Sequence, residues 1–218
     1  MLILLPPSEG KSSPERGRKL NLKTLFGSPD LTDIRTQLIE SHQEIDETLC
    51  RPAHEIYSGV LYQALAWESL STAAKKRGSE SILIISALMG AIRIDDIIPT
   101  YKLKITTSLW KKPLTHLLES LDSDLIIDCR SSTYSGVWTP PHEKTVAIRV
   151  FQVKGGTKTV ITHMSKKYRG ELVRHLLQNS APRTTQELLA YVKKKFECEF
   201  TPSTSKEPSY LDLLIPMD

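Results

Sequence analysis

The chain has 218 residues and a mass of 24.6 kDa, which is enough to bury a hydrophobic core without disulfide bonds or a structural metal. Hydrophobic residues make up 39% and charged residues 25% of the sequence, the mixture of a soluble globular protein. No apolar run approaches the roughly 20 residues of a membrane span, so the composition excludes a membrane-spanning protein, and the formal net charge is only +4.

The three cysteines suggest a reducing compartment. They lie far apart and form no C-x-x-C pair, which argues against a disulfide framework or a thiolate zinc site. The opening run Met1–Leu5 lacks a basic lead-in and a small-residue cleavage site, so we expect no secretory signal. We therefore expect a cytoplasmic protein.

Predicted strands and helices alternate along the N-terminal half. Strands are expected in short apolar runs, and helices where apolar residues recur at helical spacing. In chain order these are a strand at Leu2–Leu5, a polar loop at 8–19, an amphipathic helix at Asp30–Leu49, a helix at Leu61–Lys76 and a buried strand at Ser81–Ala87.

The same alternation continues to the C-terminus. The predicted elements are a helix at Leu109–Leu121 whose start is trimmed by Pro113, a strand at Leu125–Cys129, a hairpin of Thr145–Val153 with Thr157–Met164, a basic helix at Lys166–Gln178, a helix from Thr184 to Phe196, and a hairpin of Cys198–Phe200 with Tyr210–Ile215. Repeats and linkers are absent. We expect one α/β domain over residues 1–218, with a mixed β-sheet and flanking helices.

Charge is distributed unevenly along the chain. Residues 27–70 contain eight acids and two bases, whereas residues 141–196 contain twelve Lys and Arg and three acids. Such segregation favours an anion-binding face, a cationic cleft; clustered solvated lysines are the open alternative.

Three polar segments follow predicted strands, where ligands commonly bind in α/β proteins. In the first, Gly10 would admit a ligand near the backbone while Ser8 and Lys11 hold a phosphate or carboxylate; a flexible surface loop is the alternative. In the second, Arg93 would receive an anion, or would simply pair with a neighbouring aspartate, and Tyr101 follows nearby.

The third segment contains Ser131 and Tyr134, whose hydroxyls could hold an anion or cap a helix. A basic run from Ser165 to Gly170 completes the set, with a solvated basic face as its alternative. The common nucleotide, hydrolase and zinc-protease motifs are absent, and the six histidines lack ligand spacing. We therefore expect no metal and no cofactor.

Together these segments resemble the YaaA family of bacterial peroxide-stress proteins, in the branch common in high-GC Gram-positive bacteria. The resemblance runs in order through nearly the whole chain: ILLPPSEGKS at the N-terminus, EIYSGVLYQAL at 55–65, SALMGAIRIDDIIPTYKL at 86–103, LIIDCRSSTY at 125–134, VFQVKGG at 150–156 and SKKYRGELVRHLLQN at 165–179.

The resemblance implies an α/β domain of unusual topology with a positively charged cleft. It also implies a cytoplasmic protein that limits unincorporated iron during peroxide stress, and double-stranded DNA binding through a helix-hairpin-helix-like element. The positions that match the family's motifs are Ser8, Lys11, Tyr57, Gly59, Ser86, Gly90, Arg93, Pro99, Tyr101, Ser131, Tyr134, Lys166, Lys167, Arg169 and Gly170.

One departure concerns DNA binding. In the family the hairpin lies between the N-terminal helix and the Y-[ST]-G motif, but this chain has no glycine between Gly27 and Gly59, and the interval is acidic. The hairpin is therefore expected to be trimmed, and DNA would have to use the basic 141–196 region or the first loop.

Two functional hypotheses follow. The first is a peroxide-stress protein whose cationic cleft binds double-stranded DNA. The second is an enzyme acting on a small anionic or nucleotide-like substrate in the same cleft, with Lys11, Arg93, Tyr101, Tyr134 and Lys166 as candidate catalytic residues. A narrow pocket would favour the second hypothesis, and a groove as wide as a duplex the first.

Overall fold

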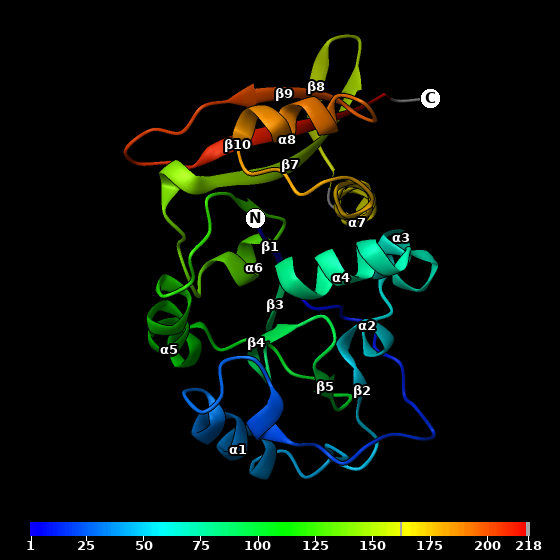
Figure 1. Ribbon diagram of the computed structural model, residues 1–218, viewed down its shortest axis with the longest axis vertical. Coiled ribbons are helices and arrows are strands. Elements are labelled where there is room, and N and C mark those ends of the chain that lie inside the picture. The colour runs from blue at the N-terminus through cyan, green and yellow to red at the C-terminus, as the bar shows by residue number, and fades with distance from the viewer. Residues whose placement is uncertain (162, 217–218) are drawn as a thin grey trace.

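A computed structural model describes residues 1–161 and 163–216. A mixed sheet runs through the molecule in the order β4-β3-β1-β6-β7-β10-β9, with β8 paired to β7, and β2 and β5 form a separate pair (Figure 1). The strands are β1 (Leu2–Leu5), β2 (Arg51–Pro52), β3 (Ile82–Ser86), β4 (Gly90–Arg93), β5 (Ile97–Ile98), β6 (Ile126–Asp128), β7 (Thr145–Lys154), β8 (Thr157–Val160), β9 (Glu197–Thr201) and β10 (Ser209–Pro216).

The helices pack on both faces of this sheet. They are α1 (Thr32–Glu40), α2 (Ala53–Ile56), α3 (Val60–Leu65), α4 (Thr72–Ser81), α5 (Thr107–Glu119), α6 (Ser132–Ser135), α7 (His163–Gln178) and α8 (Thr185–Val192). Helices α2, α3, α4, α7 and α8 contribute to the core on one face, and α5 packs on the other. The expected α/β architecture, a mixed sheet with flanking helices, is confirmed.

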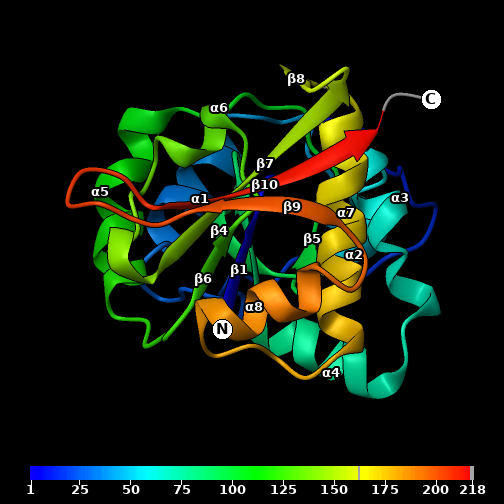
Figure 2. The same cartoon turned by 90° about the horizontal axis from the view of Figure 1, so that it is seen from above.

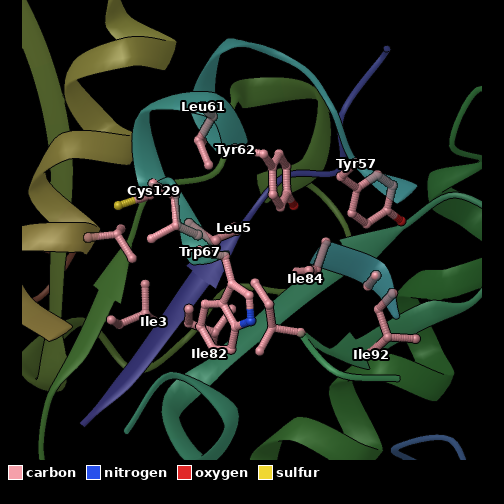
Figure 3. Close-up of a cluster of buried hydrophobic side chains, with 14 of the residues drawn as sticks. Ile3, Leu5, Tyr57, Leu61, Tyr62, Trp67, Ile82, Ile84, Ile92 and Cys129 are labelled. Atoms are coloured by element: carbon pink, nitrogen blue, oxygen red, sulfur yellow. The ribbon is translucent and has the colours of Figure 1, made fainter. Parts of the chain in front are cut away.

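The centre of the sheet is parallel and buried on both faces. Strand β1 pairs in parallel with β3 on one side and with β6 on the other. Ile3 and Leu5 point into one core and Leu2 and Leu4 into the other, which explains why the strand is apolar without alternation (Figure 3). Figure 3 also shows Trp67, from the segment after α3, packed among these residues.

Strand β7 is the long member of the sheet. One of its edges pairs in parallel with β10. The other edge pairs with β6 over residues 145–147 and then, beyond the end of β6, with β8 over residues 151–154. Figure 2 shows β7 and β10 crossing the direction of β1 at a large angle, as the twist of a mixed sheet produces.

Three predicted helices were too long, and the last of them, expected to reach Phe196, ends at Val192. The first ends at Glu40 instead of Leu49, and Asp46 then forms a turn in which its Oδ1 accepts the Thr48 N–H at 2.8 Å, a local bond that competes with helix. The second is interrupted at Ala66, which adopts a left-handed conformation (φ 47°), and Ser71 caps a new helix, α4, by accepting the Ala74 N–H.

Two other boundaries also differ. Pro113 does not trim α5, because the helix begins at Thr107 and carries the proline inside it while Trp110, Leu114 and Leu118 bury the sheet-facing side. The second strand of the first hairpin ends at Val160, and Met164 belongs to α7. The C-terminal hairpin is confirmed, with β9 and β10 antiparallel. Within residues 1–161 and 163–216, no helix has the length and hydropathy that crossing a bilayer requires.

Candidate functional site

A cavity lies at the ends of β1 and β6, where the order of the strands reverses from one side of β1 to the other. After β1 the chain builds β3 on one side, and after β3 it crosses to build β6 on the other, so the loops that follow β1 and β6 diverge at their carboxyl ends. This is the place where open α/β sheets bind ligands. The cavity has a volume of about 630 Å³.

Five segments line the cavity. Its residues are Pro6–Gly10, Gly59–Tyr62, Ser131, Ser132 and Tyr134, Arg149–Phe151, and Val160, Ile161, Ser165, Lys166 and Arg169. The wall therefore combines cations, hydroxyls, one acid (Glu9) and an apolar patch. Another hollow, of about 560 Å³ between residues 140–143 and 203–205, has neither Lys nor Arg in its lining.

The loop after β1 is held in place by hydrogen bonds. The Ser8 side chain is buried, and its Oγ accepts the backbone N–H of Gly59 at 2.7 Å. The Lys11 ammonium donates to the Ser8 carbonyl oxygen at 2.8 Å. An added Cβ at Gly59 would overlap Ser8 Oγ, so glycine is required for this approach. The loop is thus a fixed wall of the cavity and not a flexible surface segment.

A buried polar chain lies next to this loop. The hydroxyls of Tyr57 and Tyr101 are 2.8 Å apart, and the Tyr101 hydroxyl is 2.8 Å from Ser86 Oγ, which in turn accepts the Met89 N–H at 3.0 Å. The Lys11 Nζ lies 4.3 Å from the centre of the Tyr101 ring. Burial lowers the pKa of Lys11 and raises the pKa of Tyr101 to about 12. These groups stand behind the cavity wall and support it.

Helix α7 supplies the cations of the opposite wall. The Lys166 Nζ lies 3.8 Å from Glu9 Oε1. One terminal nitrogen of Arg169 donates to the Ile148 carbonyl at 3.1 Å, while its buried Nε has no hydrogen-bond partner among the residues that the structure describes. An added Cβ at Gly170 would overlap the Leu61 carbonyl, so this glycine lets α7 approach α3 closely, as Figure 1 and Figure 2 show.

The loop after β6 is fixed by an ion pair. The Arg130 guanidinium donates to both carboxylate oxygens of Asp128, at 2.9 and 2.7 Å, and to the carbonyls of Tyr134 and Trp138 at 3.3 and 3.0 Å. This pair holds Ser131 and Tyr134 at the cavity. Burial, with a smaller contribution from the Glu9 carboxylate, raises the pKa of Tyr134, so its phenol is protonated at neutral pH and is a weaker acid than a free tyrosine.

The third cation of the lining is already paired. The Arg149 guanidinium contacts both carboxylate oxygens of Asp212 at 2.6 and 2.9 Å and lies 4.1 Å from the Tyr210 ring. Because Asp212 compensates its charge, Arg149 contributes less to the potential of the cavity than Lys166 and Arg169 do.

The structure gathers some of the sequence-derived candidates and separates others. Those that line the cavity are Ser8, Ser131, Tyr134, Lys166 and Arg169. Lys11, Tyr57, Ser86 and Tyr101 form the polar layer behind it. Lys167 lies on α7 beside Glu171 and is absent from the lining.

Arg93 occupies a different place. Strand β4 runs antiparallel to β3 and pairs Arg93 with Leu83, which carries the residue back to the amino-terminal end of β3. There its guanidinium donates to the Glu80 carbonyl at 2.8 Å and lies 4.8 Å from the Phe26 ring. The turn that follows is fixed by the Arg93 backbone N–H, which donates to Asp96 Oδ2 at 2.8 Å.

Several lining residues were outside the sequence-derived candidates, and three of them, Glu9, Arg149 and Phe151, matter for the chemistry of the cavity. Glu9 lay within the first polar segment but carried no signal of its own. Arg149 and Phe151 lie inside β7, and they reach the cavity because β7 extends past the end of β6. The lengths of paired strands cannot be read from the sequence. Phe151 lies in the VFQVKGG segment, but that segment supplied no candidate site residue, and no motif contains Arg149.

The fold and the cavity define an α/β protein with a small-molecule-sized pocket at the switch point of its sheet. Comparison with known proteins adds the family. The chain belongs to the peroxide stress protein YaaA family, whose family model matches residues 16–200.

Two relatives match most of the chain. A UPF0246 protein of Streptomyces coelicolor is 34% identical, with the alignment covering 99% of this chain and 98% of the relative. A UPF0246 protein of Corynebacterium efficiens is 36% identical over 85% of this chain and 88% of the relative. The first alignment spans 260 positions, more than the 218 residues of this chain, so that relative contains residues that are missing here.

Proposed function

We propose that this protein acts in the peroxide-stress response by binding a small phosphate-bearing molecule in the cavity between the loops after β1 and β6 and helix α7. The role in peroxide stress follows from family membership. The small-molecule ligand is supported by the cavity itself, and it is the second of the two hypotheses drawn from the sequence.

The observation that carries the proposal is the size and composition of the cavity. Its volume of about 630 Å³ falls in the range of about 300–1,000 Å³ that is typical of small-molecule sites. A duplex would need a groove about as wide as itself. Cations on α7 face hydroxyls on the opposite loops, an arrangement that suits a phosphate in the middle.

Each group of the cavity has a role in this proposal. Lys166 and Arg169 neutralise the charge of the phosphate, and the Ser131 hydroxyl donates a hydrogen bond to it. Tyr134 is the candidate proton donor for chemistry because its side chain lines the cavity, and its raised pKa makes it a weaker acid than a free tyrosine. Lys11 acts as a positioning residue, since its ammonium already donates to the Ser8 carbonyl.

Calorimetric titration with adenosine 5′-monophosphate at low salt tests the proposal. We expect one site per chain, and Lys166→Gln should weaken binding about tenfold because it removes a charge-assisted hydrogen bond. The control is Lys112→Gln, which makes the same charge change on α5, away from the cavity. Absence of binding, or equal weakening by both substitutions, would count against the site.

Double-stranded DNA is the second candidate ligand. Exposed lysines favour it, namely Lys144, Lys154, Lys166, Lys167, Lys193, Lys194 and Lys195. The interval expected to carry the family's DNA-binding hairpin contains only α1, turns, β2 and the single turn of α2, so a duplex would have to use the basic C-terminal surface.

A labelled duplex titrated at about 50 and about 200 mM salt tests this candidate. Contacts to several phosphates predict a steep loss of affinity, with a log–log slope near −0.9 for each phosphate neutralised. A flat salt response or no binding at the lower salt would reject it.

Limitation of free intracellular iron is the cellular role that family membership suggests for this chain. Within the described residues there is no group of three or more His, Cys, Asp or Glu arranged to hold a metal ion. We therefore place the iron effect downstream of the bound ligand. Measuring free iron in cells that carry Lys166→Gln tests this link, since the variant should behave like a deletion.

A further inference from the structure

We propose that Glu9 sets the specificity of the cavity: it disfavours ligands that carry only negative charge and favours a phosphate ester whose sugar hydroxyl donates a hydrogen bond to its carboxylate. The inference rests on the proposed function, because it assumes that a phosphate binds near Lys166. It identifies the ligand class as a nucleoside monophosphate.

The position of Glu9 is the first observation. Its carboxylate lines the mouth of the cavity, and its side chain is 92% exposed while reaching within 3.8 Å of the Lys166 ammonium on the opposite wall. The preceding residue, Ser8, is fixed by its hydrogen bond to Gly59. A fixed backbone therefore places an exposed carboxylate beside Lys166.

The second observation is that the charge of Glu9 changes the pKa values of neighbouring groups. The Glu9 carboxylate partly offsets the burial that lowers the pKa of Lys11, and it adds to the burial that raises the pKa of Tyr134. Its negative charge is therefore felt by three groups, Lys11, Tyr134 and Lys166. A phosphate bound among them would feel the same charge.

Stabilisation of the fold does not explain this acid. The Glu9–Lys166 pair is long and exposed, and exposed ion pairs contribute little to stability. A pure anion such as inorganic phosphate gains from Lys166 but is repelled by Glu9. A sugar phosphate reduces this conflict, because a neutral hydroxyl near Glu9 donates a hydrogen bond to the carboxylate and offsets part of the repulsion that its phosphate feels.

The rest of the lining suits the remainder of such a ligand. Phe151, Val160 and Ile161 provide apolar surface from β7 and from the end of β8 to the lining of the cavity. A planar base can cover this surface while the phosphate stays near α7. Sugar phosphates without a base would leave it exposed to water.

The test compares three probes on three proteins. The probes are adenosine 5′-monophosphate, inorganic phosphate and pyrophosphate, and the proteins are wild type, Glu9→Gln and Glu15→Gln. Glu15 is an exposed acid of the same loop that does not line the cavity, so its substitution controls for net charge. Binding is measured at low salt, and urea unfolding is measured alongside.

We expect Glu9→Gln to bind phosphate and pyrophosphate about two- to fivefold more tightly, which corresponds to the energy of an exposed charge pair, and to lose its preference for the nucleotide. Glu15→Gln should match wild type, and unfolding should be unchanged in both variants.

Two results would overturn the inference. If all proteins bind the probes with the same ratios of affinity, Glu9 does not determine specificity, while the proposed anion site stands. If no probe binds any of the proteins, the proposed function fails and the inference fails with it.

Discussion

At the scale of single residues, the contact between Ser8 and Gly59 joins the loop after β1 to the start of α3. Gly59 has φ −74°, which any residue can adopt, so only the space in front of its Cα requires glycine. That space is occupied by the Ser8 hydroxyl, which accepts the Gly59 N–H. One wall of the cavity therefore depends on two small residues 51 positions apart.

A double-mutant cycle measures this dependence. Gly59→Ala should lower the free energy of unfolding by about 1–3 kcal/mol, because the new methyl group displaces the Ser8 hydroxyl and breaks the hydrogen bond. In a Ser8→Ala background the same substitution should cost clearly less, since the obstructing hydroxyl is gone. Additive costs in urea unfolding would show that the two residues are independent.

The buried Tyr101 hydroxyl predicts loss of stability at alkaline pH. Burial raises its pKa from 10.0 to about 12. Between these values the folded protein keeps a proton that the unfolded chain has lost, so stability that is fully present below pH 10 falls as pH rises to 12. The full loss would be about 2–3 kcal/mol at 1.36 kcal/mol per pKa unit.

Urea unfolding from about pH 9 to about pH 12 of wild type and Tyr101→Phe tests this linkage. The variant should be less stable near neutral pH, because Ser86 and Tyr57 lose a hydrogen-bond partner, but its stability should fall less steeply with pH. The pKa of the buried Cys129 thiol is also raised, but by burial and without a contribution from Tyr101, so this thiol titrates equally in both proteins. Identical slopes would contradict the assignment.

At the scale of elements, the close packing of α7 on α3 sets the width of the cavity. Helix α3 carries Leu61 and Tyr62, and α7 carries Lys166 and Arg169. Gly170 permits this approach, since any side chain there would meet the Leu61 carbonyl. The distance between the two walls therefore depends on one glycine inside a helix.

Gly170→Ala tests this packing, because close packing predicts a loss of stability where this substitution in a helix usually gives a gain. Glycine to alanine inside a helix ordinarily stabilises by up to about 1 kcal/mol. Here we expect destabilisation by about 1–3 kcal/mol and weaker nucleotide binding, because α7 must move away from α3. Gly136→Ala is the control, as its new methyl group meets only Thr107 Cγ2 at 3.6 Å. A stabilised Gly170→Ala variant would refute the close approach.

The elements also show what a sequence can reveal. Continuous apolar runs predict β1 and β3 closely, because strands buried on both faces need no alternation. Helix limits are harder to predict, because they depend on single backbone choices such as the left-handed Ala66 and the Asp46 turn. Neither choice changes the apolar spacing on which the helix predictions rest.

At the scale of the whole molecule, topology decides which polar segments meet. Ser8 and Ser131 follow the parallel strands β1 and β6 near the switch point, so their convergence can be predicted from parallel strands alone. The α7 cations come after β8, which is antiparallel to β7, so parallel strands do not predict their position. Arg93 also follows a strand, but the β3–β4 hairpin reverses the chain and carries it away. The sequence does not specify this reversal. Arg93 therefore follows a predicted strand, as the other candidates do, but it does not lie at the cavity.

The uneven charge of the chain has a structural counterpart. The acidic interval 27–70 forms α1, α2 and α3 with their connecting turns, and the basic interval 141–196 forms α7, α8 and the β7–β8 hairpin. Glu9 places one acid among the cations of α7. We expect this mixture to select small, partly neutral ligands over a uniformly charged duplex.

Competition between the two ligand classes tests the central claim most directly. A fluorescent adenosine monophosphate is bound to the wild-type protein at low salt and then challenged with unlabelled nucleotide or with a duplex at the same concentration of phosphate groups. Unlabelled nucleotide should displace the probe, the duplex should leave it bound, and Lys166→Gln should bind the probe about tenfold more weakly. Displacement by the duplex, or failure of the nucleotide to bind while the duplex does, would contradict a small-molecule site at the end of β1 and β6.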